Sequence, residues 1–179
     1  MATRRHWMAF PLHVTFGRLD RSFDDFVVGR SSALLRTAVL LCGGDRYAAE
    51  DMLQVALLRL ARHWHRGLDR PEAYVRRVLV NLAQDRARDR RRRPVETGWP
   101  EGAVPALRVA DPTEHDDLMQ AVRDLPARQR AVLVLRVWDD LTVEETAEAL
   151  GCSPGTVKSY TSRALARLRQ VLERSDHAY

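Results

Sequence analysis

The stretch that decides the fold is LTVEETAEALGCSPGTVKSYTSRALARLR, residues 141–169. Thr142 and Glu145 have the spacing of a capping box, which predicts the start of a short helix. Gly151 follows this helix, and glycine readily adopts the left-handed backbone that a sharp turn after a helix requires. The stretch therefore predicts a short helix that starts at the capping box and ends at Gly151.

A second, longer helix is predicted to follow the turn. Ser153 can cap its first turn, and Pro154 suits the first helical position because an N–H there would have no partner within the helix. Apolar residues at helical spacing predict its inward side: Val157, Ala164, Leu165 and Leu168. Two helices joined by a tight turn predict a helix-turn-helix, whose second helix enters the major groove of DNA.

The other face of this second helix carries hydrogen-bonding side chains. Six of them are the predicted DNA contacts: Thr156, Lys158, Ser159, Ser162, Arg163 and Arg167. Those near the helix start are placed to reach base edges, and Arg167 suits a phosphate contact. Residues 139–148 hold five acidic side chains and no basic one, whereas residues 154–174 hold five basic side chains and one acidic one. An ordinary helical hairpin with a solvated basic face is the alternative interpretation.

Upstream, apolar residues at helical spacing predict three more helices. Glycines or capping residues indicate where these helices end or begin. Gly43 and Gly44 end the first of them, and Gly67 ends the second. The third is expected to start with a capping box formed by Asp69 and Glu72. Its buried stripe is predicted from four apolar residues: Val75, Val78, Leu79 and Leu82.

An arginine-rich segment ends this third helix. Residues 84–93 contain six arginines against two aspartates, and the last four arginines are consecutive. Such a run is too highly charged to be buried, so it suits contacts with nucleic-acid phosphates. A solvated charge run or an interaction tail is the alternative. Tyr74, Asn81 and Gln84 could add base stacking or base hydrogen bonds if the DNA is opened here.

The composition predicts an all-α fold with a polyanionic partner. The 179 residues are 45% hydrophobic, 30% charged and only 7% aromatic, and helix-forming residues dominate. The net charge of +5 points to nucleic acid or an acidic membrane surface. Lys158 is the only lysine, so the chain uses arginine for nearly all of its positive charge. The positions where arginines cluster are therefore more informative than the use of arginine itself.

A change in composition divides the chain. Residues 94–113 contain four prolines and two glycines and show no helical period, which predicts a flexible linker. We therefore predict a disordered tail over 1–20, a helical domain over 21–93, the linker, and a helix-turn-helix domain over 114–179. We call residues 21–93 the first half of the chain and residues 114–179 the second half.

Other classes of protein are disfavoured by what the sequence lacks. Cys42 and Cys152 lie far apart and have no zinc-ligand spacing, so neither a metal site nor a cofactor is expected. No nucleophile with its base and no phosphate-binding loop is evident, which argues against an enzyme. No apolar run approaches the length of about 20 residues that spans a membrane, and no signal peptide is evident, so a cytoplasmic location is expected.

Four segments of this sequence resemble a bacterial RNA polymerase sigma factor of the extracytoplasmic-function type, closest to actinobacterial members. AAEDMLQ (48–54) looks like the polymerase-binding helix of that family, and AYVRRVLVNLA (73–83) like its promoter-melting helix. LPARQRAVL (125–133) resembles the start of its second domain, and GTVKS (155–159) the start of its recognition helix. The resemblance covers about residues 23–174.

The resemblance implies a non-enzymatic protein that holds RNA polymerase core on promoter DNA. The first half would bind the clamp of the β′ subunit through Asp51, Leu53 and Gln54. It would also contact the minus-ten element through five residues: Tyr74, Arg76, Arg77, Asn81 and Arg88. The second half would bind the flap of the β subunit and contact the minus-thirty-five element through the six residues of the recognition helix. An anti-sigma factor is the further partner that the resemblance implies.

Two features depart from the family pattern. Val55 follows Gln54 where family members often carry an acidic residue, and Tyr74 is the only aromatic residue of the melting helix. A stand-alone helix-turn-helix regulator of the response-regulator type is the main alternative. Such a protein would need a receiver domain of alternating strands and helices, and residues 23–93 predict helices only.

Overall fold

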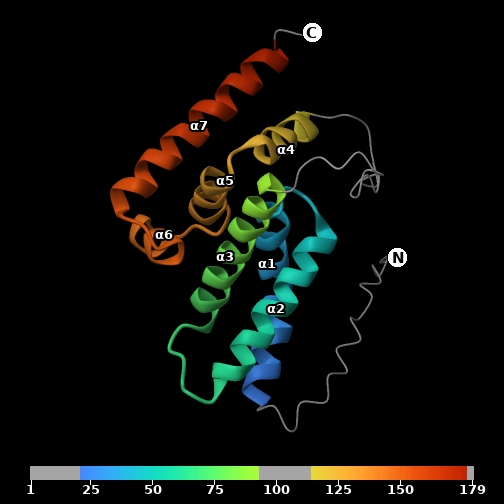
Figure 1. Ribbon diagram of the computed structural model, residues 1–179, viewed down its shortest axis with the longest axis vertical. Coiled ribbons are helices and arrows are strands. Elements are labelled where there is room, and N and C mark those ends of the chain that lie inside the picture. Colours follow the sequence, from blue (N-terminus) through green and yellow to red (C-terminus); the bar gives the residue numbers. More distant parts are fainter. Residues whose placement is uncertain (1–20, 93–113, 177–179) are drawn as a thin grey trace, which may run out of the picture.

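The computed structural model describes residues 21–92 and 114–176, and the regular structure of these two segments is entirely helical (Figure 1). The elements are α1 (Arg21–Leu41), α2 (Arg46–Trp64), α3 (Pro71–Arg92), α4 (Glu114–Asp124), α5 (Ala127–Leu133), η1 (Val134–Trp138), α6 (Val143–Leu150) and α7 (Pro154–Asp176). Helices α1–α3 pack side by side, and α4–α7 form a second group beside α3. The predicted all-α class is confirmed.

The helix-turn-helix has the predicted local geometry. The Glu145 amide donates to Thr142 Oγ1 at 3.1 Å and the Thr142 amide donates to Glu145 Oε2 at 2.9 Å, which completes the capping box of α6. Gly151 ends α6 in the left-handed conformation, with φ at 61°. The Thr156 amide then donates to Ser153 Oγ at 3.2 Å and caps α7. Each such cap stabilises its helix by about 1 kcal/mol.

The start of α3 differs from the expected capping box. Because the helix begins at Pro71, Asp69 lies outside the capping position and Glu72 is the second helical residue. The Glu72 carboxylate instead accepts from Arg76 Nη2 at 2.7 Å, and its other oxygen lies 3.4 Å from Arg30 Nε of α1. Glu72 therefore connects α3 to α1 rather than capping α3.

Helix α5 continues into a π-helical turn, η1. The Asp139 amide donates to the Val134 carbonyl at 3.0 Å, five residues back, so the backbone is wound more widely here than in an α-helix. Leu135 is fully buried in this turn, whereas 64% of Val137 and 57% of Trp138 are exposed. Isolated π turns are frequent at functional sites.

The largest hydrophobic core joins the two halves of the chain. Most of its buried members come from α1–α3, and four come from the second half: Ala131, Val134, Leu135 and Ala149. On α3 the predicted stripe is buried at Val75, Val78 and Leu79, but Val80 is also fully buried. Val80 lies about 100° around the helix from Leu79. Helix α3 is thus covered on more than one side, because α5 and α6 pack against it as well as α1 and α2.

Two smaller cores belong to the second half alone. One lies between α4, α5 and α7 and includes Leu125, Leu133 and Leu168. The other, between α5, α6 and α7, is built around Val132, Ala147 and Val157. These cores fix α7 against α5 and α6, so the face of α7 that points outward is set by packing.

Replacing Thr146 with valine is expected to raise the free energy of unfolding. Thr146 is fully buried, and its hydroxyl has no hydrogen-bond partner within the described part of the chain. Valine has nearly the same shape and removes this unsatisfied group, so a gain of up to about 1 kcal/mol is expected in urea unfolding. Thr161→Val is the control: its hydroxyl donates to the Val157 carbonyl at 2.9 Å, so its loss should destabilise. Equal effects of the two substitutions would contradict this account.

Candidate nucleic-acid interface

Five of the six predicted contacts of α7 lie on its outward half, and Arg167 lies just beyond the edge of that half. At about 100° per residue these five spread over the side opposite Val157, from Lys158 to Thr156. Four of the six are exposed: Lys158, Ser162, Arg163 and Arg167. Thr156 and Ser159 are half-buried and make local hydrogen bonds, since Thr156 Oγ1 lies 2.9 Å from Ser153 Oγ and Ser159 Oγ donates to the Thr156 carbonyl at 2.9 Å.

A basic groove of about 380 Å³ runs beside the recognition helix. Its lining residues come from η1, α6 and α7: Arg136, Val143, Lys158, Thr161, Ser162, Leu165 and Arg169. Leu165 corrects the sequence prediction, because 36% of it is exposed and it faces this groove rather than the core. Arg136 was missed because it lies in an apolar segment, and only the fold brings it close to Lys158.

The outward face of α3 brings together three of the five predicted minus-ten contacts. Arg77, Asn81 and Arg88 are exposed and share one side of the helix, since they are separated by four and seven residues. Arg88 Nη2 also donates to Asp85 Oδ1 at 2.6 Å. Tyr74 lies on the edge of this face and is half-buried, with its ring centroid 5.7 Å from that of His63.

Arg76 is not on this open face. Only 17% of its side chain is exposed, and its guanidinium lies between two carboxylates. Nη2 donates to Glu72 at 2.7 Å and Nε donates to Asp139 Oδ2 at 2.9 Å. In this structure the Arg76 guanidinium is therefore already paired with two carboxylates of the same chain.

Part of the arginine-rich segment stabilises the fold. Arg86 Nη2 lies 3.0 Å and Arg90 Nη2 3.3 Å from Asp45 Oδ2, and Asp45 also caps α2 by accepting from the Ala48 amide at 3.0 Å. Burial alone would raise the pKa of Asp45, but the Ala48 amide and the Arg86 charge together hold it below its usual value. Two of the predicted phosphate-binding arginines thus also fix the start of α2.

The candidate polymerase contacts on α2 divide between the surface and the core. Asp51 and Gln54 are exposed, as expected. Leu53 differs from them: only 7% of it is exposed and it belongs to the shared core, so the structure gives it a packing role and its contact with polymerase stays a prediction. The sequence prediction missed Tyr47 and Val55, which are 72% and 37% exposed and lie on the same side as Asp51. An exposed tyrosine among polar residues is typical of a protein-binding surface.

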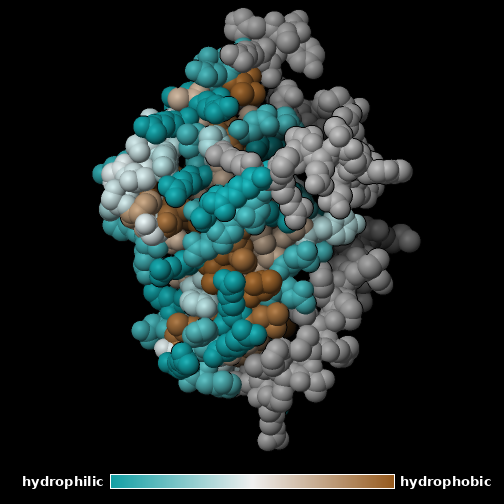
Figure 2. Space-filling view, viewed as in Figure 1, coloured by the Kyte–Doolittle hydropathy of each residue, from teal (hydrophilic) through white to brown (hydrophobic). Residues whose placement is uncertain are grey.

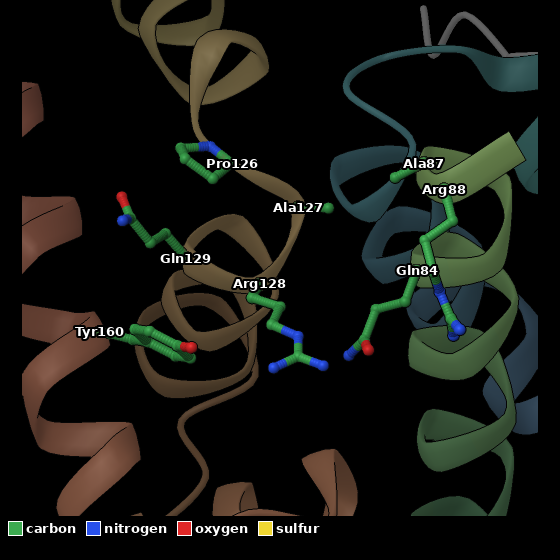
Figure 3. Close-up of a pocket in the computed structure, with 8 residues that line it drawn as sticks. All are labelled: Gln84, Ala87, Arg88, Pro126, Ala127, Arg128, Gln129 and Tyr160. Carbon is green, nitrogen blue, oxygen red and sulfur yellow. The ribbon is translucent and has the colours of Figure 1, made fainter. Parts of the chain in front are cut away.

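A cleft of about 320 Å³ lies between the last part of α3 and the second half (Figure 3). Gln84, Ala87 and Arg88 of α3 line one side, and the other side is lined by Pro126, Ala127, Arg128, Gln129 and Tyr160. The side chains of Arg128 and Gln84 extend into the space between the two walls (Figure 3). Residues predicted to act on DNA in the first half therefore lie next to the recognition helix of the second half.

Hydrophilic residues predominate on the face seen in Figure 2, and hydrophobic residues reach it only in small separate areas. Across residues 21–92 and 114–176, no group of three or more His, Cys, Asp or Glu residues is placed to hold a metal ion. None of the helices in these segments is both long and apolar enough to cross a membrane.

Comparison with known proteins matches both halves to one family. Residues 27–93 match the model of sigma-70 region 2, and residues 115–168 match that of sigma-70, region 4. An RNA polymerase sigma-E factor from Streptomyces antibioticus is 44% identical over 160 residues, which cover 86% of each chain. The ECF RNA polymerase sigma factor SigM from Mycobacterium tuberculosis is 35% identical over 161 residues, covering 86% of this chain and 79% of SigM.

A solved structure has a similar fold. It is the sigma factor RpoE from Bartonella quintana, crystallised with the anti-sigma factor NepR. The TM-score is 0.67 at 26% sequence identity, and the match covers 86% of this chain and 98% of that one. The family resemblance of the sequence, including its actinobacterial character, is confirmed by these relatives.

Proposed function

This chain belongs to the sigma-70 family, as a sigma factor of the extracytoplasmic-function (ECF) type, and we propose how its parts divide the work. As an alternative sigma factor it binds RNA polymerase core and directs promoter-specific transcription initiation. Residues 21–93 act as region 2, residues 114–179 as region 4, and residues 94–113 as the linker between them. The tail predicted over 1–20 and this linker lie outside the described residues.

The minus-thirty-five element is read by the outward half of α7. The observation that carries this proposal is the intact helix-turn-helix, with Lys158, Ser162, Arg163 and Arg167 exposed on its second helix. Side chains near the start of such a helix reach base edges, and those further along reach phosphates. Thr156 and Ser159 contribute from the edge of the contact surface, and Arg136 and Arg169 extend its positive charge.

The minus-ten element is held by the outward face of α3. Arg77 and Arg88 suit phosphates, Asn81 suits a base edge, and Tyr74 can stack on an unpaired base. Opening the duplex costs a few kcal/mol for each extruded base, which these contacts must offset. Arg76 can join them only after it leaves Asp139.

Polymerase binds the outward face of α2 through Asp51 and Gln54, with Tyr47 and Val55 beside them. This face would meet the clamp of the β′ subunit. The exposed pair Val137 and Trp138 offers the second half an apolar contact for the flap of the β subunit. The solved complex of RpoE with an anti-sigma factor supports a partner of that kind here.

The protein carries no catalytic activity of its own in this proposal, because polymerase supplies the chemistry. No cofactor is needed, and the site of action is the cytoplasm, where polymerase and promoter meet. A stand-alone regulator of the response-regulator type is not favoured, because residues 27–93 match sigma-70 region 2 rather than a receiver domain.

Run-off transcription tests the proposal. Core polymerase from a related actinobacterium is supplied with a pool of candidate promoters, with and without this protein. Specific transcripts are expected only when the protein is present, and their start sites identify the promoter. Absence of such transcripts, together with tight binding of the protein alone to DNA in a gel shift, would favour the stand-alone regulator instead.

A further inference from the structure

The cleft between the end of α3 and the second half contains polar side chains that have no partner in the protein. Four of its lining side chains make no hydrogen bond or ion pair within the part of the chain that the structure describes: Gln84, Arg128, Gln129 and Tyr160. All of them except Arg128 are half-buried, so water reaches them only in part. Polar groups that converge in this way on one hollow are typical of a small-molecule site.

The walls of the cleft are fixed by packing on both sides. Val134 and Leu135 of the second half are buried in the same core as Leu79 and Val80 of α3. The ring of Tyr160 packs against the smaller core between α5, α6 and α7, which holds this side chain beside α5. A site whose walls are already in place loses little conformational entropy when a ligand binds.

The lining of the cleft is positively charged. Arg88 and Arg128 come from opposite walls, and no acidic residue is among the described residues that line it. Arg88 is paired with Asp85 at 2.6 Å, so Arg128 supplies the charge that has no counterion in the protein. A guanidinium presents two parallel N–H donors that match two oxygens of a phosphate. The cleft therefore favours an anionic group next to Arg128, whose side chain extends into the space between the walls (Figure 3).

The other lining groups suit a flat, polar ring. The side-chain amides of Gln84 and Gln129 both donate and accept, which is what the edge of a nucleobase requires. Tyr160 offers an aromatic face for stacking, and Ala87 and Ala127 add small apolar surfaces. The volume of about 320 Å³ lies near the lower end of the range for small-molecule sites, so it suits one nucleotide and not a duplex or a helix of a partner.

We propose that this cleft binds a nucleoside phosphate, with Arg128 on the phosphate, the Gln84 amide on the base edge and Tyr160 beside the base. The ligand contacts α3, α5 and α7 together. Because it binds the folded chain, it raises the melting temperature in proportion to the logarithm of its concentration above Kd. This site is a function beyond the proposed contacts with promoter DNA and polymerase.

Isothermal titration calorimetry of the full chain with AMP, GMP, CMP and UMP tests the site. At least one of them is expected to bind with a Kd below about 1 mM and to raise the melting temperature. The matching free nucleoside and inorganic phosphate each lack part of the contacts, so each is expected to bind at least about tenfold more weakly. No binding of any nucleotide would overturn the proposal, and so would equal affinity for inorganic phosphate.

Arg128→Gln removes the unpaired charge and is expected to weaken nucleotide binding by about tenfold or more. Arg123→Gln is the matched control, since Arg123 is also exposed and carries the same charge, but lies beside Gly44 and outside the cleft. Tyr160→Leu removes the aromatic face and is expected to weaken binding by about fivefold or more. An equal loss in Arg128→Gln and Arg123→Gln would overturn the site, because net charge alone would then govern binding.

Two further measurements keep the test decisive. The melting temperature of each variant without nucleotide shows whether it is folded, and full nucleotide affinity in a folded Arg128→Gln chain would overturn the proposal. Binding of a single-stranded oligonucleotide without binding of any free nucleotide would also overturn it, since the cleft would then belong to the DNA-binding surface. A negative result leaves the sigma-factor function intact, because run-off transcription tests that function separately.

Discussion

Replacing Leu53 with alanine is expected to lower the free energy of unfolding by about 2–5 kcal/mol. The side chain is only 7% exposed and lies in the core that α1–α3 share with the second half. Truncating it removes buried apolar contacts and leaves a cavity that the neighbouring helices can fill only in part. Urea unfolding followed by circular dichroism measures the effect.

Gln54→Ala is the paired substitution one residue away. Gln54 is exposed, so its loss should change the free energy of unfolding by less than about 0.5 kcal/mol while weakening retention on core polymerase in a pull-down. The two adjacent residues thus separate a folding role from a binding role. The assignment of α2 would be wrong if Gln54→Ala kept full polymerase retention and a well-folded Leu53→Ala lost it.

Removing Lys158 or Arg163 is expected to weaken promoter binding by about 1–3 kcal/mol for each residue replaced with alanine. Both side chains are exposed near the start of the recognition helix, where base edges are within reach. The effect is measured with holoenzyme on the promoter from the transcription experiment and on a version altered at the minus-thirty-five element. A base contact loses discrimination between the two sequences, whereas a phosphate contact weakens both equally and lowers the salt dependence.

Arg36→Ala is the control for these two variants. Arg36 is exposed on α1 and lies outside both proposed DNA-binding surfaces, yet its replacement removes the same unit of positive charge. An equal loss of affinity in Arg36→Ala would mean that net charge, and not the position on α7, governs binding. Unchanged transcription in both α7 variants would exclude this helix face as the reading surface.

Most local signals in the sequence predicted local structure, although the expected capping box of α3 did not form. The Thr142 capping box, the Gly151 turn and the Ser153 cap each involve groups only a few residues apart, so the sequence contains all the partners that matter. Hydrophobic spacing likewise predicted the helices α1–α3. Hydrophobic spacing is limited, however, because it identifies the apolar face of a helix but not how deeply each residue on that face is buried. Leu165 was therefore expected in the core, although 36% of it is exposed.

Contacts between distant parts of the chain could not be predicted in the same way. Asp139 appeared as one member of an acidic run, and its burial depends on Thr37 and Arg76, which are 102 and 63 positions away. Arg76 was predicted as a DNA contact for its charge, and the partners that occupy it are visible only in the fold. The roles of Arg86 and Arg90 at Asp45 are a similar case, since any exposed arginine run suits phosphates equally well.

The core shared by the two halves has a consequence for the thermodynamics of the chain. Ala131, Val134, Leu135 and Ala149 are buried against helices that match a different region of the family. Part of the stability of each half is therefore supplied by the other, and unfolding of one half removes that part from its neighbour. Although two separate family models match the two halves, they share one core in this structure, so we expect them to unfold as one cooperative unit and a destabilising substitution in either half to lower the stability of both.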